Sequence, residues 1–409
     1  MRTSRTLGVA AALVLAACDF HVTNPGPVQD DFLDNGAAFP AIVNGAGRNL
    51  SDALNYISYT GAAVARELNP AGSTGSFGIS VQQQNGKLND DEVNDHWVRA
   101  QQARWTAEQG LERLRAGLKT DFAKSKDAAQ LLLWAAYSNR LLGENMCDAV
   151  IDGGAKQPYT TYLERAEAQF TEAIAVATAA PQPAMATAAT AGRASVRVLR
   201  GNWAGAAADA AGVPNAFVYQ MPYNTVDIDQ YNRIFWAGAN QPYRAHTVWH
   251  TFYEDYYKST KDPRVAWDLD PKNPTGDAAV GNLGRVPWYF QTKFKVRESP
   301  INLSSGWEMR LVEAEAKLVS GDVTGAAPLI NAHRVALGLA PWPTATAADA
   351  WTALKRERGI ELWLEARRLG DLRRWTAANR PGTSDDMTGR DLCFPISRSE
   401  KETNPNLGT

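Results

Sequence analysis

The segment MRLVEAEAKLVSGDVTGAAPLINAHRV, residues 309–335, decides the fold. Its first part, Met309 to Val319, carries apolar residues at helical spacing, and Gly321-Asp322-Val323 then interrupts the pattern. An alanine-rich segment with its own helical pattern follows, from Ala326 to Val335. Glycine commonly ends a helix, and small side chains allow two helices to approach closely. The segment therefore predicts a hairpin of two packed helices.

A second segment repeats this arrangement. Ala194 to Arg200 leads into the turn Gly201-Asn202-Trp203, and a helix of small residues follows from Ala204 to Ala211. Both segments resemble the tetratricopeptide hairpin, a unit of about 34 residues that stacks on its neighbours. The two copies are not in tandem, because a long stretch of different composition separates them.

Helical periodicity elsewhere extends this frame. Tyr162, Ala166, Phe170 and Ile174 are spaced by four, so they share one face that a partner helix must cover. Further helices are expected over residues 30–66, 97–114 and 131–142. We therefore predict one all-α dominated domain over residues 31–409, in which the frame spans 31–212 and 306–409 and an inserted subregion spans 213–305.

The C-terminal segment from Leu354 to Trp375 is predicted to be one helix. Glu357, Glu361 and Glu365 are spaced by four along it, and six arginines supply the opposite charge. Charged pairs at helical spacing are usually structural. We expect these side chains to form ion pairs that lock neighbouring helices together.

The N-terminus has the features of a lipoprotein export signal. Arg2 and Arg5 precede an apolar run that ends in Leu15-Ala16-Ala17-Cys18, a small-residue pattern that places a cleavage site before the cysteine. The run is too short for a transmembrane helix, which needs about 20 residues. We predict a signal peptide over 1–17, a lipid on Cys18 and a tether over 18–30; the alternative is an ordinary secretory peptide cleaved elsewhere.

Export would place the two remaining cysteines, Cys147 and Cys393, in an oxidising compartment. A disulfide between them is the first hypothesis, and two buried free thiols are the alternative. The composition is that of an ordinary folded chain, with 44% hydrophobic and 21% charged residues. Its net charge of −2 gives no electrostatic reason to expect nucleic acid as a partner.

Catalytic motifs are absent from the sequence: it has no nucleophile elbow, zinc-protease motif, phosphate loop or dinucleotide fingerprint. His246, His250 and Glu254 are spaced by four and would meet one metal ion on a helix, but this spacing among aromatic residues is more typical of a polar and aromatic surface. A pair of glycosidase carboxylates leaves no trace in sequence. We expect no enzymatic activity, no metal and no cofactor.

Binding is the better interpretation of the insertion, which is rich in Tyr, Trp, Asn and Asp. Sugar rings pack their C–H faces on aromatic side chains, and their hydroxyls hydrogen-bond to polar side chains. The candidate stacking platforms are Trp249, Trp267, Trp288 and Tyr289. Arg66 and Asn69, at a Gly-rich and Pro-rich loop near the N-terminus, are the candidate contacts for hydroxyls.

Several segments resemble the RagB/SusD-like family of nutrient-uptake outer-membrane lipoproteins. They are residues 22–25 (VTNP), 299–303 (SPINL), 308–316 (EMRLVEAEA), 321–322 (GD), 355–362 (KRERGIEL), 367–375 (RRLGDLRRW), 394–397 (FPIS) and 404–407 (NPNL). The resemblance implies four tetratricopeptide-like units around a variable binding subregion. It also implies a membrane-anchored partnership with a SusC-like TonB-dependent transporter, although Asp19 next to the lipidated cysteine signals inner-membrane retention in some bacteria.

The function we expect is non-catalytic capture of a nutrient, first of all a glycan, for delivery to that transporter at the outer membrane. Capture of peptides is the alternative within the same class. A scaffold that only contacts proteins through its helical surface is an alternative of another class, and a lipoprotein glycosidase is the least favoured.

Overall fold

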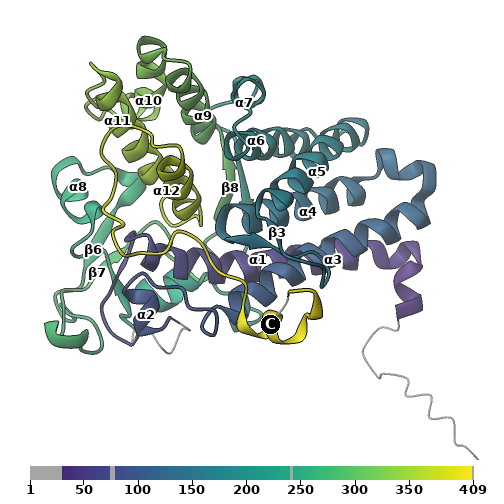
Figure 1. Cartoon of the computed structure of the whole chain (residues 1–409), viewed down its shortest axis with the longest axis horizontal. Coiled ribbons are helices and arrows are strands. Elements are labelled where there is room, and N and C mark those ends of the chain that lie inside the picture. The colour runs from purple at the N-terminus through teal and green to yellow at the C-terminus, as the bar shows by residue number, and fades with distance from the viewer. Residues whose placement is uncertain (1–29, 74–78, 240–242, 408–409) are drawn as a thin grey trace, which may run out of the picture.

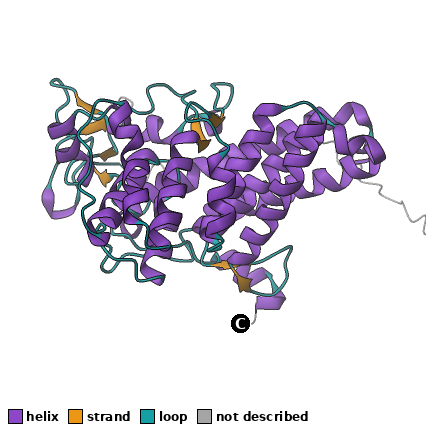
Figure 2. Cartoon of the chain, turned by 90° about the horizontal axis from the view of Figure 1, so that it is seen from above, coloured by secondary structure: helices purple, strands orange, loops and turns teal. Residues whose placement is uncertain are grey.

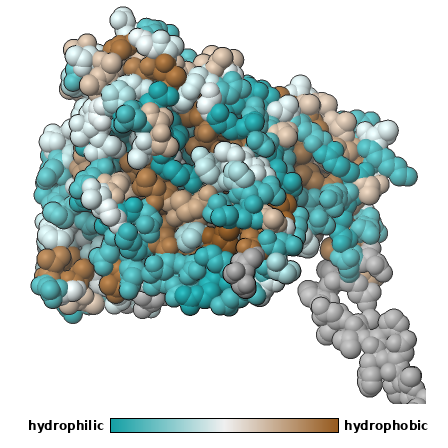
Figure 3. All heavy atoms as spheres, viewed as in Figure 1, coloured by the Kyte–Doolittle hydropathy of each residue, from teal (hydrophilic) through white to brown (hydrophobic). Residues whose placement is uncertain are grey.

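The computed structural model describes residues 30–73, 79–239 and 243–407. The predicted signal peptide, Cys18 and all but the last residue of the tether lie outside these ranges. Helices dominate the described chain, and short strands lie among the loops (Figure 2). None of the described helices has the length and apolar character needed to cross a bilayer. On the face shown in Figure 3, hydrophilic residues predominate and apolar residues gather in separate patches.

The α-helices are α1 (Phe39–Val64), α2 (Val81–Gln84), α3 (Asn94–Leu118), α4 (Lys126–Asn145), α5 (Thr160–Ala179), α6 (Pro183–Leu199), α7 (Trp203–Ala211), α8 (Phe252–Thr260), α9 (Gly306–Val319), α10 (Val323–Ala336), α11 (Ala347–Glu361), α12 (Arg368–Ala377) and α13 (Arg398–Thr403). The strands form antiparallel pairs: β1 (Asn69–Pro70) with β5 (His246–Thr247), β2 (Asp148–Ala149) with β3 (Gln157–Pro158), β4 (Val218–Met221) with β8 (Ile301–Ser305), and β6 (Trp267–Leu269) with β7 (Tyr289–Gln291).

Helices α6–α7 and α9–α10 are the two predicted hairpins, and the all-α dominated, tetratricopeptide-like fold class is confirmed. Each turn has a glycine at positive φ, Gly201 or Gly321, followed by a residue whose side chain caps the next helix. Helix α7 packs on α9, so the two hairpins stack although the insertion separates them in sequence (Figure 1). Their interface is a core of small and branched residues: Ala191, Ala194, Val198, Ala206, Ala210, Met309 and Val312.

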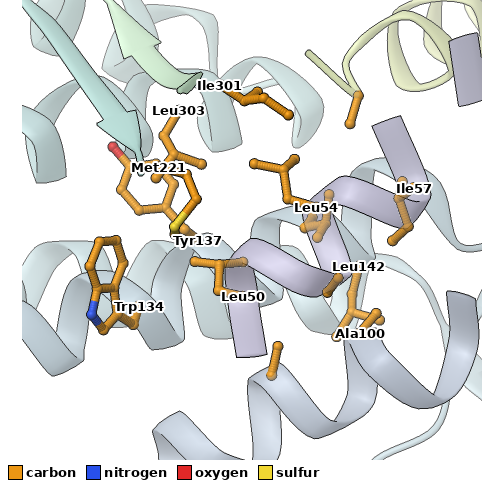
Figure 4. Close-up of a cluster of buried hydrophobic side chains, with 14 of the residues drawn as sticks. Leu50, Leu54, Ile57, Ala100, Trp134, Tyr137, Leu142, Met221, Ile301 and Leu303 are labelled. Atoms are coloured by element: carbon orange, nitrogen blue, oxygen red, sulfur yellow. The ribbon is translucent and has the colours of Figure 1, made fainter. Parts of the chain in front are cut away.

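Strands β4 and β8 explain how the frame continues across the insertion. They lie at the two ends of the insertion and pair antiparallel, from Val218 opposite Ser305 to Met221 opposite Ile301. The chain therefore leaves and re-enters the frame at neighbouring points. Figure 4 shows the residues buried there: Leu50, Leu54 and Ile57 of α1, Ala100 of α3, Trp134, Tyr137 and Leu142 of α4, Met221 of β4, and Ile301 and Leu303 of β8.

The single helix predicted over Leu354–Trp375 is wrong, because the chain turns between α11 and α12. Leu364 and Ala366 have φ values of 63° and 61° in the left-handed region, which costs a non-glycine residue energy. Side chains from distant segments hold the turn. Glu67 accepts a hydrogen bond from the Leu364 N–H at 3.1 Å, and Asn145 donates one to the Ala366 carbonyl at 3.2 Å.

The three glutamates of this region form ion pairs, but their partners are cations of the insertion and not the six arginines of the segment that we predicted. Glu357 and Glu361 both bind Arg264 of the insertion, and Glu365 binds Lys293 at 2.7 Å. Arg367, the residue before α12, is paired as well. Arg367 joins Glu144 of α4 to Glu308 of α9, with 2.8 Å to each carboxylate.

A disulfide joins Cys147 to Cys393, with their Cα atoms 5.0 Å apart. Cys147 follows α4, and Cys393 lies in the C-terminal segment. Backbone hydrogen bonds flank the bond, from the Cys147 N–H to the Phe394 carbonyl and from the Phe394 N–H to the Asn145 carbonyl. The C-terminal segment is thereby fixed to the end of α4.

Candidate functional site

The predicted aromatic platforms lie in and beside the two-stranded sheet of β6 and β7. Successive side chains of a strand point to opposite faces, so Tyr289 faces one side and Trp288 and Phe290 face the other. Trp267 is paired with Gln291 across the sheet and therefore lies on the Tyr289 side. The sheet thus separates the predicted platforms into two groups.

Trp288 is a core residue, and its predicted role as a stacking platform is wrong. Only 1% of its surface is exposed, and its indole N–H donates to the Gly238 carbonyl at 2.9 Å. It forms a small core with Ala71 and Val286, against which Trp249 and Phe290 pack. A buried tryptophan whose N–H is already bonded has neither a face nor a donor for a ligand.

Trp267 and Tyr289 form a stacked pair on the other side of the sheet. Their ring centroids are 4.6 Å apart, their planes differ by 20°, and both side chains are half-buried. The Lys258 Nζ of α8 lies 5.8 Å from the Trp267 centroid and 5.5 Å from the Tyr289 centroid. The ring centroid of Tyr257 lies 5.8 Å from that of Trp267. The pair offers a ligand aromatic surface bordered by a cation.

Two of the predicted contacts, Trp249 and Asn69, come together. Strands β1 and β5 bring the N-terminal loop to the insertion, and the Asn69 amide donates to the Trp249 carbonyl at 2.8 Å. Trp249 is half-buried, and the exposed ring of His250 lies 5.5 Å from it. His250 has a φ of 60° and is held there by a hydrogen bond from its N–H to Glu254. This strained, exposed residue marks the edge of the site.

Glu254, in the first turn of α8, connects the two aromatic groups. Its carboxylate accepts the His250 N–H at 2.7 Å and binds Lys258, and its carbonyl accepts the Trp267 indole N–H at 3.3 Å. The bond to Glu254 raises the pKa of Lys258. We call this region the α8 surface; it consists of Trp249, His250, Glu254, Tyr257, Lys258, Trp267 and Tyr289.

Arg66 faces a different neighbour. Its guanidinium donates to the Asp386 carbonyl at 3.5 Å, so it contacts the C-terminal loop, and no described contact joins it to Trp249. His246 is also separate from the α8 surface, because it is buried in β5 and bonded to the Tyr59 hydroxyl. Burial lowers the pKa of His246 to about 3, so the ring is neutral. His246, His250 and Glu254 therefore do not share a helix face, and the described residues contain no cluster suited to a metal ion.

A second aromatic group was not selected from the sequence. Tyr231, Trp236 and Tyr243 are half-buried neighbours with ring centroids 5.4 and 5.7 Å apart along the series. The Arg297 guanidinium lies over the Tyr231 and Trp236 rings, at 4.9 and 4.7 Å. The rings were visible as part of the aromatic composition. Arg297 was not, because its approach depends on the return path of the insertion.

Comparison with known proteins agrees with this architecture. The model of the SusD family matches residues 225–407. A SusD superfamily protein from Bacteroides vulgatus is 16% identical with a TM-score of 0.64, and the alignment covers 91% of this chain and 98% of that one. A SusD-like carbohydrate binding protein from the same species is 14% identical with a TM-score of 0.62, over 91% and 97% of the two chains.

The surface glycan-binding protein A from Bacteroides uniformis is 14% identical with a TM-score of 0.60, over 89% of this chain and 98% of that one. No match was found among curated protein sequences. The resemblance to RagB/SusD-like proteins that the sequence suggested is confirmed by the family match and by the shared fold.

Proposed function

Taking the chain as SusD-like, we propose that it is a non-catalytic binding protein that captures a glycan at the α8 surface. The observation that carries the proposal is the presence there of half-buried aromatic rings beside the exposed polar side chains of His250 and Lys258. Trp249, Trp267 and Tyr289 offer rings, and His250 and Lys258 offer hydrogen bonds. A sugar needs both kinds of contact at once.

The names of two structural neighbours, a carbohydrate binding protein and a glycan-binding protein, support a glycan over a peptide. The α8 surface adds a physical reason. Its charged groups are paired with each other, since Lys258 binds Glu254, so a neutral ligand does not leave an isolated charge beside it.

We further propose that Cys18 carries a lipid that holds the domain at the outer membrane, beside a SusC-like TonB-dependent transporter to which it delivers the glycan. Tethering a binding domain next to its recipient raises the effective concentration of ligand there. Metabolic labelling with a clickable palmitate analogue tests the anchor, with Cys18→Ala as the control. Membrane fractionation of the labelled chain decides between the outer and the inner membrane.

Glycan binding is tested with the purified chain on a glycan array and by calorimetry on the hits. We expect Trp249→Ala and Trp267→Ala each to weaken binding by roughly tenfold, which corresponds to about 1.4 kcal/mol. The matched control is Trp105→Ala, because Trp105 is 51% exposed on α3 and lies outside the α8 surface. Binding to peptides alone, or release of reducing sugar by the purified chain, would contradict the proposal.

A further inference from the structure

A groove separate from the α8 surface lies between helix α1, helix α4 and the loop that follows β4. Its volume is about 910 Å³, within the range of small-molecule sites. Asn44, Gly47 and Arg48 of α1 form one side, Trp134 of α4 lies at the base, and residues 221–230 form the other side. We call it the α1 groove.

The unusual feature of the α1 groove is the indole N–H of Trp134. Trp134 is only 9% exposed, but it lines the groove, and its Nε1 is not among the buried side-chain atoms of the described residues that lack a hydrogen-bond partner, so the N–H is open to the groove. Figure 4 shows the indole nitrogen on the side of the ring away from Leu50 and Leu54. An indole N–H that opens into a groove can donate to an acceptor oxygen supplied from that groove.

Gly47 keeps this donor accessible. A Cβ atom at position 47 would lie 3.0 Å from Trp134 Nε1 and 3.2 Å from Cε2. Gly47 is in the interior of α1, where glycine is less favourable than alanine. Its lack of a side chain thus costs helix stability and leaves the indole N–H uncovered.

The opposite wall is held in place by hydrogen bonds to α1. The Tyr223 hydroxyl donates to the Ser51 carbonyl at 3.0 Å, and the Ser51 hydroxyl donates to the Gln230 side chain at 2.9 Å. Arg48 and Asp227 form an ion pair at 2.9 Å between the two walls. These hydrogen bonds hold the opposite wall against α1, and the charges of Arg48 and Asp227 neutralise each other.

From these contacts we infer that the α1 groove binds a neutral sugar ring, at a site independent of the α8 surface. The Trp134 N–H would donate to a sugar oxygen, and the apolar parts of Trp134, Met221 and Tyr223 would contact the C–H groups of the ring. The side chains of Asn44 and Asn224, exposed at the rim, supply both donors and acceptors for further hydroxyls. An anion or a cation fits less well, because the paired Arg48 and Asp227 offer neither a free positive nor a free negative charge.

The test uses the indole ¹⁵N–¹H resonances of the purified chain, with the Trp134 signal assigned as the one lost in Trp134→Phe. Maltose, cellobiose, laminaribiose and mannobiose are titrated separately, and trialanine serves as the peptide probe. We expect at least one disaccharide to shift the Trp134 signal in a saturable way and trialanine to leave it unchanged.

Gly47→Ala covers the indole N–H, and because its Cβ would lie 3.0 Å from Trp134 Nε1 the indole must shift slightly, so the melting temperature is measured together with the affinity. We expect Gly47→Ala to weaken binding of the disaccharide that shifts the Trp134 signal by at least tenfold, and Trp134→Phe, which removes the donor without adding a Cβ to α1, to weaken the same binding in calorimetry. The double variant Trp249→Ala/Trp267→Ala should leave this binding unchanged, so the α1 groove can fail or succeed independently of the α8 surface. The inference is overturned if no disaccharide shifts the Trp134 signal, if trialanine alone does, or if Gly47→Ala binds as tightly as the parent chain.

Discussion

Replacing Glu67 by glutamine should remove a pH-dependent loss of stability. Glu67 follows α1, is 2% exposed, and accepts the Leu364 N–H in the turn between α11 and α12. Burial raises the pKa of Glu67 from 4.5 to about 7, although the hydrogen bond from Leu364 and the charges of Arg368 and Lys293 act in the opposite direction. The folded chain therefore favours the neutral carboxyl.

The sign and size of the effect follow from the two pKa values. Below pH 4.5 the carboxyl is protonated in the folded and the unfolded chain, and its ionisation costs nothing. Between pH 4.5 and about 7 the unfolded chain loses the proton first, so the free energy of unfolding falls as the pH rises. Each pKa unit corresponds to about 1.4 kcal/mol, so the loss by pH 8 amounts to about 3 kcal/mol. Glutamine cannot ionise, and it keeps an acceptor for Leu364.

Urea unfolding followed by circular dichroism measures this at half-unit steps from pH 4.5 to 8. We expect Glu67→Gln to match the parent chain near pH 4.5 and to exceed it by about 3 kcal/mol at pH 8. Glu112→Gln is the control, because Glu112 is exposed on α3 and its substitution should leave the pH profile unchanged. A constant difference between Glu67→Gln and the parent at all pH values would show that Glu67 is already ionised in the folded chain, and would refute the reasoning.

Two further predictions concern the links between distant segments. Replacing Cys147 and Cys393 by serine opens a loop with a sequence separation of 246 residues, so the free energy of unfolding should fall by about 3 to 5 kcal/mol. In the parent protein, a thiol assay of the unreduced, denatured mature chain should find no reactive thiol. Arg367→Met should cost about 3 to 5 kcal/mol in chemical denaturation, because it removes the cation that joins the two buried carboxylates of Glu144 and Glu308. A loss below about 1 kcal/mol would contradict this role.

The frame was predictable from sequence because its signals are local. The glycine turns at 201 and 321 and the spacing by four from Tyr162 to Ile174 depend only on neighbouring residues. The break between α11 and α12 was not predictable in this way. The segment from Leu362 to Arg367 contains no glycine or proline, and its turn is fixed by Glu67 and Asn145, which are remote in sequence.

In the candidate site, too, local sequence indicates the region, whereas contacts with distant residues decide which side chains are exposed. Composition drew attention to the aromatic residues of the insertion, but Trp288 and Tyr289 are adjacent and have opposite environments. Which of the two is buried depends on the face of β7 that meets Ala71 and Val286, and no local pattern specifies that face. The α1 groove was missed for a similar reason, because Gly47 and Trp134 are informative only once α1 lies across α4.

The insertion is part of the main core as well as the carrier of the proposed site. Ile234, Val248 and Tyr253 belong to the same buried cluster as Leu50 and Ile57 of α1. Among the aromatic side chains that this segment leaves half-buried are those of the α8 surface, around the start of α8 and on one face of β6 and β7. Because β4 and β8 close the insertion where it meets the frame, we expect substitutions in the α8 surface to have little effect on the stacking of α7 on α9. On the function proposed above, the ligand preference of the α8 surface depends on a small set of residues that the frame does not require.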